Sequence, residues 1–249
     1  MGVRRNWIIP VVAGLLIGSM TIGAANRVKA NELRTFNDAV AKAFTHYRSA
    51  LFYFRRKNVD PGAFELELFK GSWIAIEKKW RDRTPDAFVG DPRWKSTFGE
   101  IKNVVEVGFA VLDKEGPRAA REAIRPIRDL LSGLRQRNEI YTYADCINEL
   151  NAQMKKVWPY RHNLPKFENL DETNKVKMEA SVYEYLLLKC RKQAPEKYRN
   201  SDEFNRIFDA ALNSVRTLWD STDKKQQRRF INILRELRPY DRLIFLRFG

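Results

Sequence analysis

The chain has 249 residues, of which 44% are hydrophobic and 12% aromatic, and this composition excludes an intrinsically disordered or fibrous protein. Two cysteines exclude a disulfide-dense scaffold and a four-cysteine zinc or iron–sulfur site, and two histidines leave little imidazole for metal or acid–base chemistry. The formal net charge of +15 favours anionic partners, although a solvated helical surface rich in Lys and Arg is the alternative explanation.

The N-terminus has the three parts of a secretory signal. Arg4 and Arg5 precede an apolar run over residues 7–25, and Val28-Lys29-Ala30 provides a cleavage site before Asn31. The alternative is a membrane anchor formed by residues 7–25, because these 19 residues approach the length that crosses a bilayer. Both interpretations make residues 1–30 a signal or anchor segment and predict a periplasmic or otherwise exported protein. Export excludes nucleic acid as a partner and leaves acidic proteins and anionic lipid headgroups.

The rest of the chain shows apolar residues at helical spacing, so we predict an all-α fold. Asp60-Pro61-Gly62 is expected to end the first helix and start the second, and Asp91 is expected to cap the third. Gly116-Pro117 separates the third helix from the fourth. The four predicted helices cover residues 36–60, 61–83, 92–115 and 118–137.

The same pattern starts again at about Tyr141. Trp94 and Phe98 match Phe204 and Phe208 at an offset of 110, and residues 127–130 match residues 234–237 at an offset of 107. These matches predict an internal duplication, in which two up-down four-helix bundles follow the N-terminal segment. The predicted bundles are residues 31–139 and residues 140–249. The joint near residues 138–141 is expected to be a continuous helix or a slight bend, and residues 159–171 form the longest irregular stretch.

Cys146 and Cys190 lie near the start of one predicted helix and near the end of the next. In an antiparallel hairpin these two positions face each other. The corresponding residues of the first repeat are Ala39 and Trp80, a small residue opposite a large one. In an oxidising compartment we therefore predict a disulfide between Cys146 and Cys190. Two free thiols that act as redox or metal ligands are the alternative.

The duplicated four-helix architecture with an export signal resembles the cytochrome c′ family, the class II cytochromes c. In that family the fourth helix carries Cys-x-x-Cys-His, which attaches haem covalently. The corresponding ends here read Leu134-Arg135-Gln136-Arg137-Asn138 and Leu246-Arg247-Phe248-Gly249, with neither cysteine nor histidine. The haem role therefore does not carry over, and we predict no cofactor.

The sequence contains no recognisable catalytic motif. It has no Glu-x-x-His pair, no Gly-rich phosphate loop and no nucleophile with an evident base, so we predict that the protein is not an enzyme. The arginines of the two fourth helices favour a partner-binding surface, because guanidinium groups bind carboxylates and phosphates bidentately. Internal ion pairs are the alternative role. The predicted partner-binding residues are Arg128, Arg135, Arg235, Arg238, Arg242 and Arg247.

These features predict an exported, cell-envelope helical protein that contacts another macromolecule. We expect it to serve as an accessory subunit or adaptor with a protein partner in the envelope, such as a membrane complex. The alternative function is a haem-, metal- or small-ligand carrier related to cytochrome c′-like bundles.

Overall fold

The structure is a computed structural model that describes the backbone of residues 19–249 and the side chains of residues 31–249. Every regular element in that part of the chain is helical, which confirms the predicted all-α class. The α-helices are α1 (Ser19–Arg55), α2 (Val59–Trp80), α3 (Trp94–Glu115), α4 (Pro117–Ala123), α5 (Pro126–Arg137), α6 (Tyr143–Val157), α7 (Leu170–Gln193), α8 (Glu196–Arg199), α9 (Asp202–Asp223) and α10 (Gln227–Phe248), with short 3₁₀ turns at Asp86–Phe88 and Trp158–Arg161.

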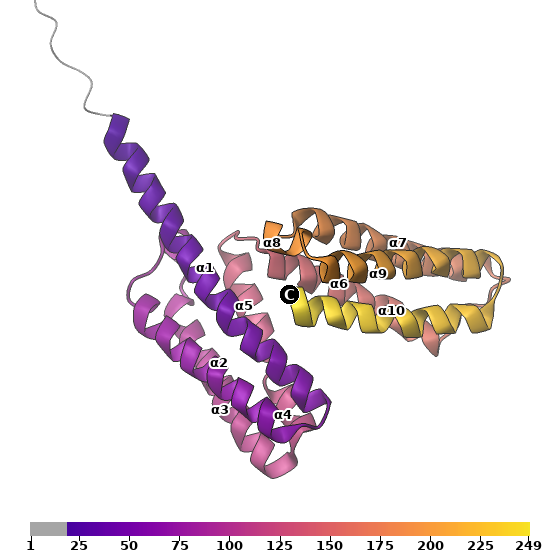
Figure 1. Cartoon of the computed structure of the whole chain (residues 1–249), viewed down its shortest axis with the longest axis horizontal. Helices are drawn as coiled ribbons and strands as arrows, with labels where there is room; N and C mark the ends of the chain where they lie inside the picture. The colour runs from indigo at the N-terminus through magenta and orange to yellow at the C-terminus, as the bar shows by residue number, and fades with distance from the viewer. Residues whose placement is uncertain (1–18) are drawn as a thin grey trace, which may run out of the picture.

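The predicted signal or anchor, residues 7–25, lies largely outside the described residues. The helix α1 begins at Ser19 and continues without a break through the predicted cleavage position at Asn31. Its first turns extend away from the other helices (Figure 1). None of the helices in residues 19–249 is apolar over enough of its length to span a bilayer.

The helices enclose two hydrophobic cores. The first core contains buried side chains from Phe36 to Leu134, supplied by α1 to α5 and the Asp86–Phe88 turn. It is rich in aromatic rings: Trp73 stacks on Phe98 with centroids 5.4 Å apart and donates from Nε1 to the Phe98 carbonyl at 3.1 Å. Such pairs combine a large buried area with favourable ring geometry.

The second core contains buried side chains from Cys146 to Phe248, supplied by α6, α7, α9 and α10. Contacts join α6 to α7, α7 to α9, α9 to α10, and α10 back to α6. Four long helices therefore close a ring around this core. The Sγ atoms of Cys146 and Cys190 are bonded in the structure, with Cα atoms 5.6 Å apart, a spacing that suits a disulfide.

Several helix boundaries differ from the predictions. The helix α1 ends at Arg55, before Asp60, since the chain turns at Lys57 with a φ of 63°. The predicted fourth helix is divided into α4 and α5, because Pro126 has no N–H to continue the helix. The joint at residues 138–142 is not a continuous helix, as Glu139 has a φ of 54°.

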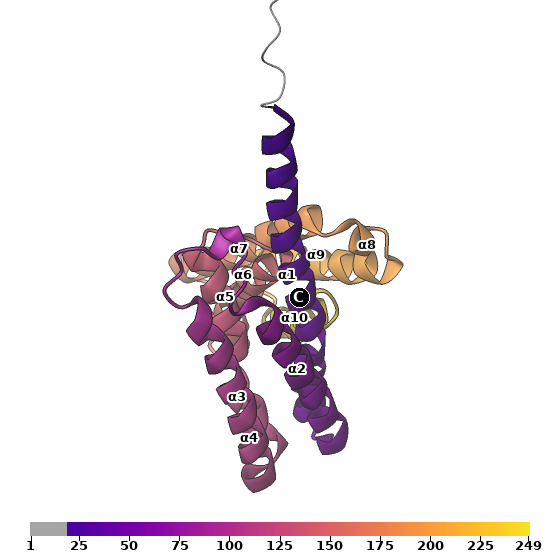
Figure 2. The same ribbon diagram turned by 90° about the vertical axis from the view of Figure 1, so that its left-hand side faces the viewer.

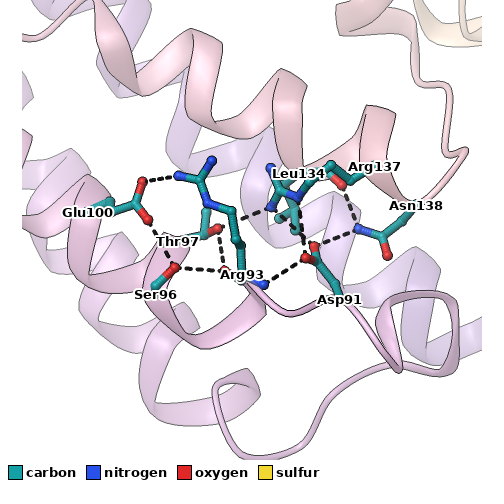
Figure 3. A network of polar contacts seen from close by, with 8 residues as sticks. All are labelled: Asp91, Arg93, Ser96, Thr97, Glu100, Leu134, Arg137 and Asn138. Carbon is teal, nitrogen blue, oxygen red and sulfur yellow. Dashed lines mark hydrogen bonds and ion pairs between the residues drawn. The ribbon is translucent and has the colours of Figure 1, made fainter.

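Asp91 does not cap α3 as predicted, because the N-cap position is Arg93. The carboxylate of Asp91 instead accepts hydrogen bonds from the Arg93 N–H at 2.9 Å, from Arg137 Nη2 at 3.1 Å and from Asn138 Nδ2 at 2.8 Å (Figure 3). Burial raises the pKa of Asp91, but these hydrogen bonds outweigh it and lower the pKa below its usual value. The loop before α3 is thereby fastened to the end of α5.

The two groups of helices lie at a wide angle to each other, with the C-terminal end of α10 beside the middle of α1 in both views (Figures 1 and 2). Phe245 is the side chain that packs against both cores. Parts of α1, α4, α5 and α10 therefore lie around one junction, which brings together arginines that are distant in the sequence.

Candidate functional site: arginines at the junction of the two cores

The junction is centred on Phe245 of α10. Its ring makes an edge-to-face contact with Phe44 of α1, with centroids 6.3 Å apart, and the Arg128 guanidinium lies 4.5 Å from the ring centroid. Its carbonyl accepts a hydrogen bond from Arg48 Nη1 at 3.4 Å. The apolar C-terminal segment is thus packed mainly in the second core, through Ile244 and Phe248, and only Phe245 also contacts the first core.

A network of polar side chains, from Arg128 through Asn151 to Asp241, connects α5, α6 and α10 at the junction. Arg128 of α5 donates from Nη2 to Asn151 Oδ1 of α6 at 3.0 Å and also contacts Asn148. Asn151 Nδ2 in turn donates to Asp241 Oδ1 of α10 at 2.8 Å. Burial lowers the pKa of Arg128 despite the nearby carboxylates. The network links helices of both cores through groups that are largely removed from water.

Asp241, the acid of this network, is deeply buried, with 2% of its surface exposed. Burial raises its pKa to about 6, although the charges of Arg238, Arg128 and Arg242 and the hydrogen bond from Asn151 act in the opposite direction. Its Oδ2 lies 3.0 Å from Arg238 Nη1. One carboxylate is therefore shared among several cations.

Outside this network four arginines converge, and we call Arg55, Arg121, Arg238 and Arg242 the arginine cluster. Arg55 is the last residue of α1, Arg121 lies on α4, and Arg238 and Arg242 lie one turn apart on α10. Arg55 is exposed and the other three are half-buried. The cluster therefore combines residues from both groups of helices.

The charges of the cluster repel one another. Burial, followed by the charges of Arg55 and Arg238, lowers the pKa of Arg242 to about 10. Burial, followed by the charges of Arg121 and Arg238, also lowers the pKa of Arg55. Neither Arg55 nor Arg242 forms an ion pair with any carboxylate among the described side chains. The cluster thus has more positive charges than carboxylates, because its ion-pair partners are Glu122 for Arg121 and Asp241 for Arg238.

The predicted partner-binding arginines fall into three environments. Arg128 and Arg135 are occupied inside the chain: Arg135 grips Asp145 with two hydrogen bonds of 2.7 Å, and the pair is almost fully buried. Arg238 and Arg242 belong to the cluster. Arg235 is exposed without an ion-pair partner among residues 31–249, and Arg247 pairs with Glu203 on the surface.

The sequence predictions did not include Arg55 and Arg121 in the site. Arg121 lies in the predicted Arg-rich fourth helix, residues 118–137, so the sequence showed its charge but not the direction of its side chain. Arg55 opens the basic run Arg55-Arg56-Lys57 at the end of α1. Nothing in that run indicates contact with α10, nearly two hundred residues later in the chain.

Other chemistry-bearing side chains are dispersed. His46 pairs with Glu65 through Nδ1 and Oε2 at 2.7 Å, a contact between α1 and α2 that the sequence spacing did not indicate. No group of three or more His, Cys, Asp or Glu side chains within the described part of the chain is arranged to hold a metal ion. Comparison of the chain with protein-family models, curated proteins and solved structures finds no match.

Proposed function

We propose that this protein is an exported, cell-envelope adaptor, made of two duplicated four-helix bundles, that binds an anionic macromolecule and catalyses no reaction. The observation that carries the proposal is the arginine cluster. Arg55 and Arg242 hold positive charge beside two further arginines without a carboxylate of their own. Like charges in proximity destabilise a fold, and an external anion bound between them would offset that cost.

The duplication supports a site at the junction rather than within one bundle. The second core is a closed ring of four helices, and the first is enclosed by α1, α2, α3 and the divided helix α4–α5. Arg55 and Arg121 come from the first group, and Arg238 and Arg242 from the second. A ligand that bridges these residues would also stabilise the relative orientation of the two groups, as an adaptor requires.

The proposal is tested by cross-linking in cells that express the full chain from its own gene. We compare the wild type with Arg55→Glu/Arg242→Glu and with Arg235→Glu/Arg247→Glu. The second variant is the control, because it changes the net charge by the same amount at two residues of α10 outside the cluster. We expect the cluster variant to lose at least tenfold in the yield of a defined cross-linked partner, and the control to stay within twofold. Equal yields for the two variants would contradict binding through the cluster.

The same preparation tests the compartment and the rival function. The intact mass reports whether residues 1–30 are removed, and fractionation reports whether the protein leaves the cytoplasm. A haem carrier of the cytochrome c′ type would show a Soret band in the absorption spectrum of the natively purified protein. We expect no such band, and its presence would replace the adaptor proposal with the carrier.

A further inference from the structure

The arginine cluster has a geometry that follows from one contact between α1 and α10. Arg48 of α1 donates a hydrogen bond to the carbonyl of Phe245 of α10 at 3.4 Å. Arg55 lies seven residues after Arg48, and Arg238 lies seven residues before Phe245. Seven residues are two helical turns, so each arginine lies on the same side of its helix as the contact, about 10 Å away from it. The Arg55 and Arg238 side chains are close enough for their charges to interact.

Two members of the cluster are held in place by the protein. Arg238 is fixed by Asp241 at 3.0 Å and lies 5.7 Å from the ring centroid of Trp158. Arg121 is fixed by Glu122 at 2.7 Å. The Nε atoms of Arg121 and Arg238 are buried and have no hydrogen-bond partner. Half of the cluster is thus held in place by the chain itself, and its buried Nε atoms are out of reach of a ligand.

The other two members, Arg55 and Arg242, have no ion-pair partner among the described side chains. Each guanidinium offers a planar fork of N–H donors that matches two oxygens of a carboxylate or phosphate. A single carboxylate has one charge and two oxygens. A phosphate monoester has about 1.5 to 2 negative charges at pH 7 and three oxygens, so it can satisfy both free arginines at once.

We propose that Arg55, Arg121, Arg238 and Arg242 form a binding site for a phosphate group, with Arg55 and Arg242 making the direct bidentate contacts. The inference rests on the proposed function, because it names the chemistry recognised by the same surface. A phosphate group can come from a soluble phosphate ester or from a phospholipid headgroup. The site itself recognises the shared chemistry.

The distance along α1 distinguishes these two sources. Arg55 is the last residue of α1, and it lies 30 residues after Ala25, so an unbroken helix places it about 45 Å from the end of the predicted anchor. If residues 7–25 anchor the chain, the cluster lies far from the surface of the anchoring membrane. This arrangement favours a phosphate group on a soluble ligand, and the experiment includes both sources.

The experiment measures binding of inorganic pyrophosphate to the purified full chain by isothermal titration calorimetry at constant ionic strength. Arg55→Gln/Arg242→Gln removes the two direct contacts, and Arg235→Gln/Arg247→Gln is the charge-matched control. We expect the cluster variant to raise the dissociation constant at least tenfold and the control to change it less than twofold. A second arm measures sedimentation with phosphatidylglycerol vesicles and with phosphatidylcholine vesicles. Cluster-dependent binding to vesicles alone assigns a lipid headgroup as the source of the same phosphate.

Thermal stability separates this site from a purely structural cluster. Without phosphate, Arg55→Gln/Arg242→Gln should melt at the same temperature as the wild type or higher, because the substitution relieves repulsion. Pyrophosphate should raise the melting temperature of the wild type and the control but not that of the cluster variant. Equal responses in all three proteins, or no response to pyrophosphate and vesicles, would overturn the phosphate site. If the cross-linked partner still depends on the cluster in that case, the adaptor proposal survives with a carboxylate-bearing partner.

Discussion

The two cores differ in how they are closed. In the first core Trp80 at the end of α2 packs edge-on against Phe36 of α1, with ring centroids 5.8 Å apart. In the second core the residue at the offset position is Cys190, which is bonded to Cys146. One group of helices is fastened by aromatic packing and the other by a covalent link.

The cores also differ in polarity. In α1 to α5 the buried polar side chains are Arg48, Thr97 and Arg135. Those between Tyr143 and Phe248 are Asp145, Asn151, Gln153, Thr173, Ser214, Ser221, Thr222 and Asp241. A buried polar group contributes little net free energy even when it is hydrogen-bonded, whereas a buried aromatic ring contributes its full apolar area. The comparison suggests that the second core needs its cross-link more than the first core would.

The largest effect is expected from Trp80→Ala in the first core. Trp80 is 2% exposed, and truncation of such a side chain leaves a cavity that costs about 3–5 kcal/mol. Hydrogen exchange measured by mass spectrometry should show faster exchange over residues 36–134 and little change over residues 143–248. Phe64→Ala is the control, because Phe64 is 64% exposed on the same helix. Equal acceleration in both regions would mean that the two cores unfold as one unit.

A slightly smaller effect is expected from Cys146→Ser/Cys190→Ser in the second core. The bond closes a loop with a sequence separation of 44 residues, and its loss should destabilise the fold by about 3–4 kcal/mol. Exchange should accelerate over residues 143–248 only, the reverse of the Trp80→Ala pattern. Alkylation of the natively purified chain before and after reduction checks that the bond is present in the cell. If the thiols react before reduction, the disulfide is absent in the cell, and the second core is not closed by a covalent link.

Much of this contrast follows from the sequence. Helical spacing predicts the long helices and their buried faces. Cys146 and Cys190 correspond in sequence to Ala39 and Trp80, and this correspondence predicts that the two cysteines face each other across one helical hairpin. These features depend on residues close together along the chain or on a repeated pattern. Local details at Lys57 and Glu139 were less accessible, because a change of backbone direction there leaves the hydrophobic period almost unaltered. The division at Pro126 could have been predicted, because a proline inside a helix removes a backbone hydrogen bond.

The junction was not predictable from the sequence. Arg55 and Arg242 meet only because Phe245 packs against both cores, and that packing depends on the angle between two groups of helices. Periodicity specifies which face of a helix is buried but not which distant helix covers it. The sequence also did not show that Arg128 and Arg135 would find internal partners while Arg242 would not.

The smallest of the three effects concerns Asp241, whose titration has no counterpart in the first core. Burial raises its pKa from 3.8 to about 6, so the folded state binds this proton more tightly than the unfolded state. Stability should therefore fall as the pH rises from about 4 to about 6, by roughly 3 kcal/mol for two pKa units. Asp91 and Asp145, whose pKa values are lowered, give the opposite trend in the whole protein.

The contribution of Asp241 is isolated by subtracting the denaturant stability of Asp241→Asn from that of the wild type at each pH. The amide keeps an oxygen for the hydrogen bond from Asn151 but carries no charge. The wild type should lose stability relative to Asp241→Asn as the pH rises from 4 to 7, and the difference in the free energy of unfolding should stay constant above pH 7. A difference that is independent of pH would mean that Arg238, Arg128 and Arg242 compensate the buried charge of Asp241 fully. Burial of the Asp241 carboxylate at the junction would then not reduce the stability of the folded state.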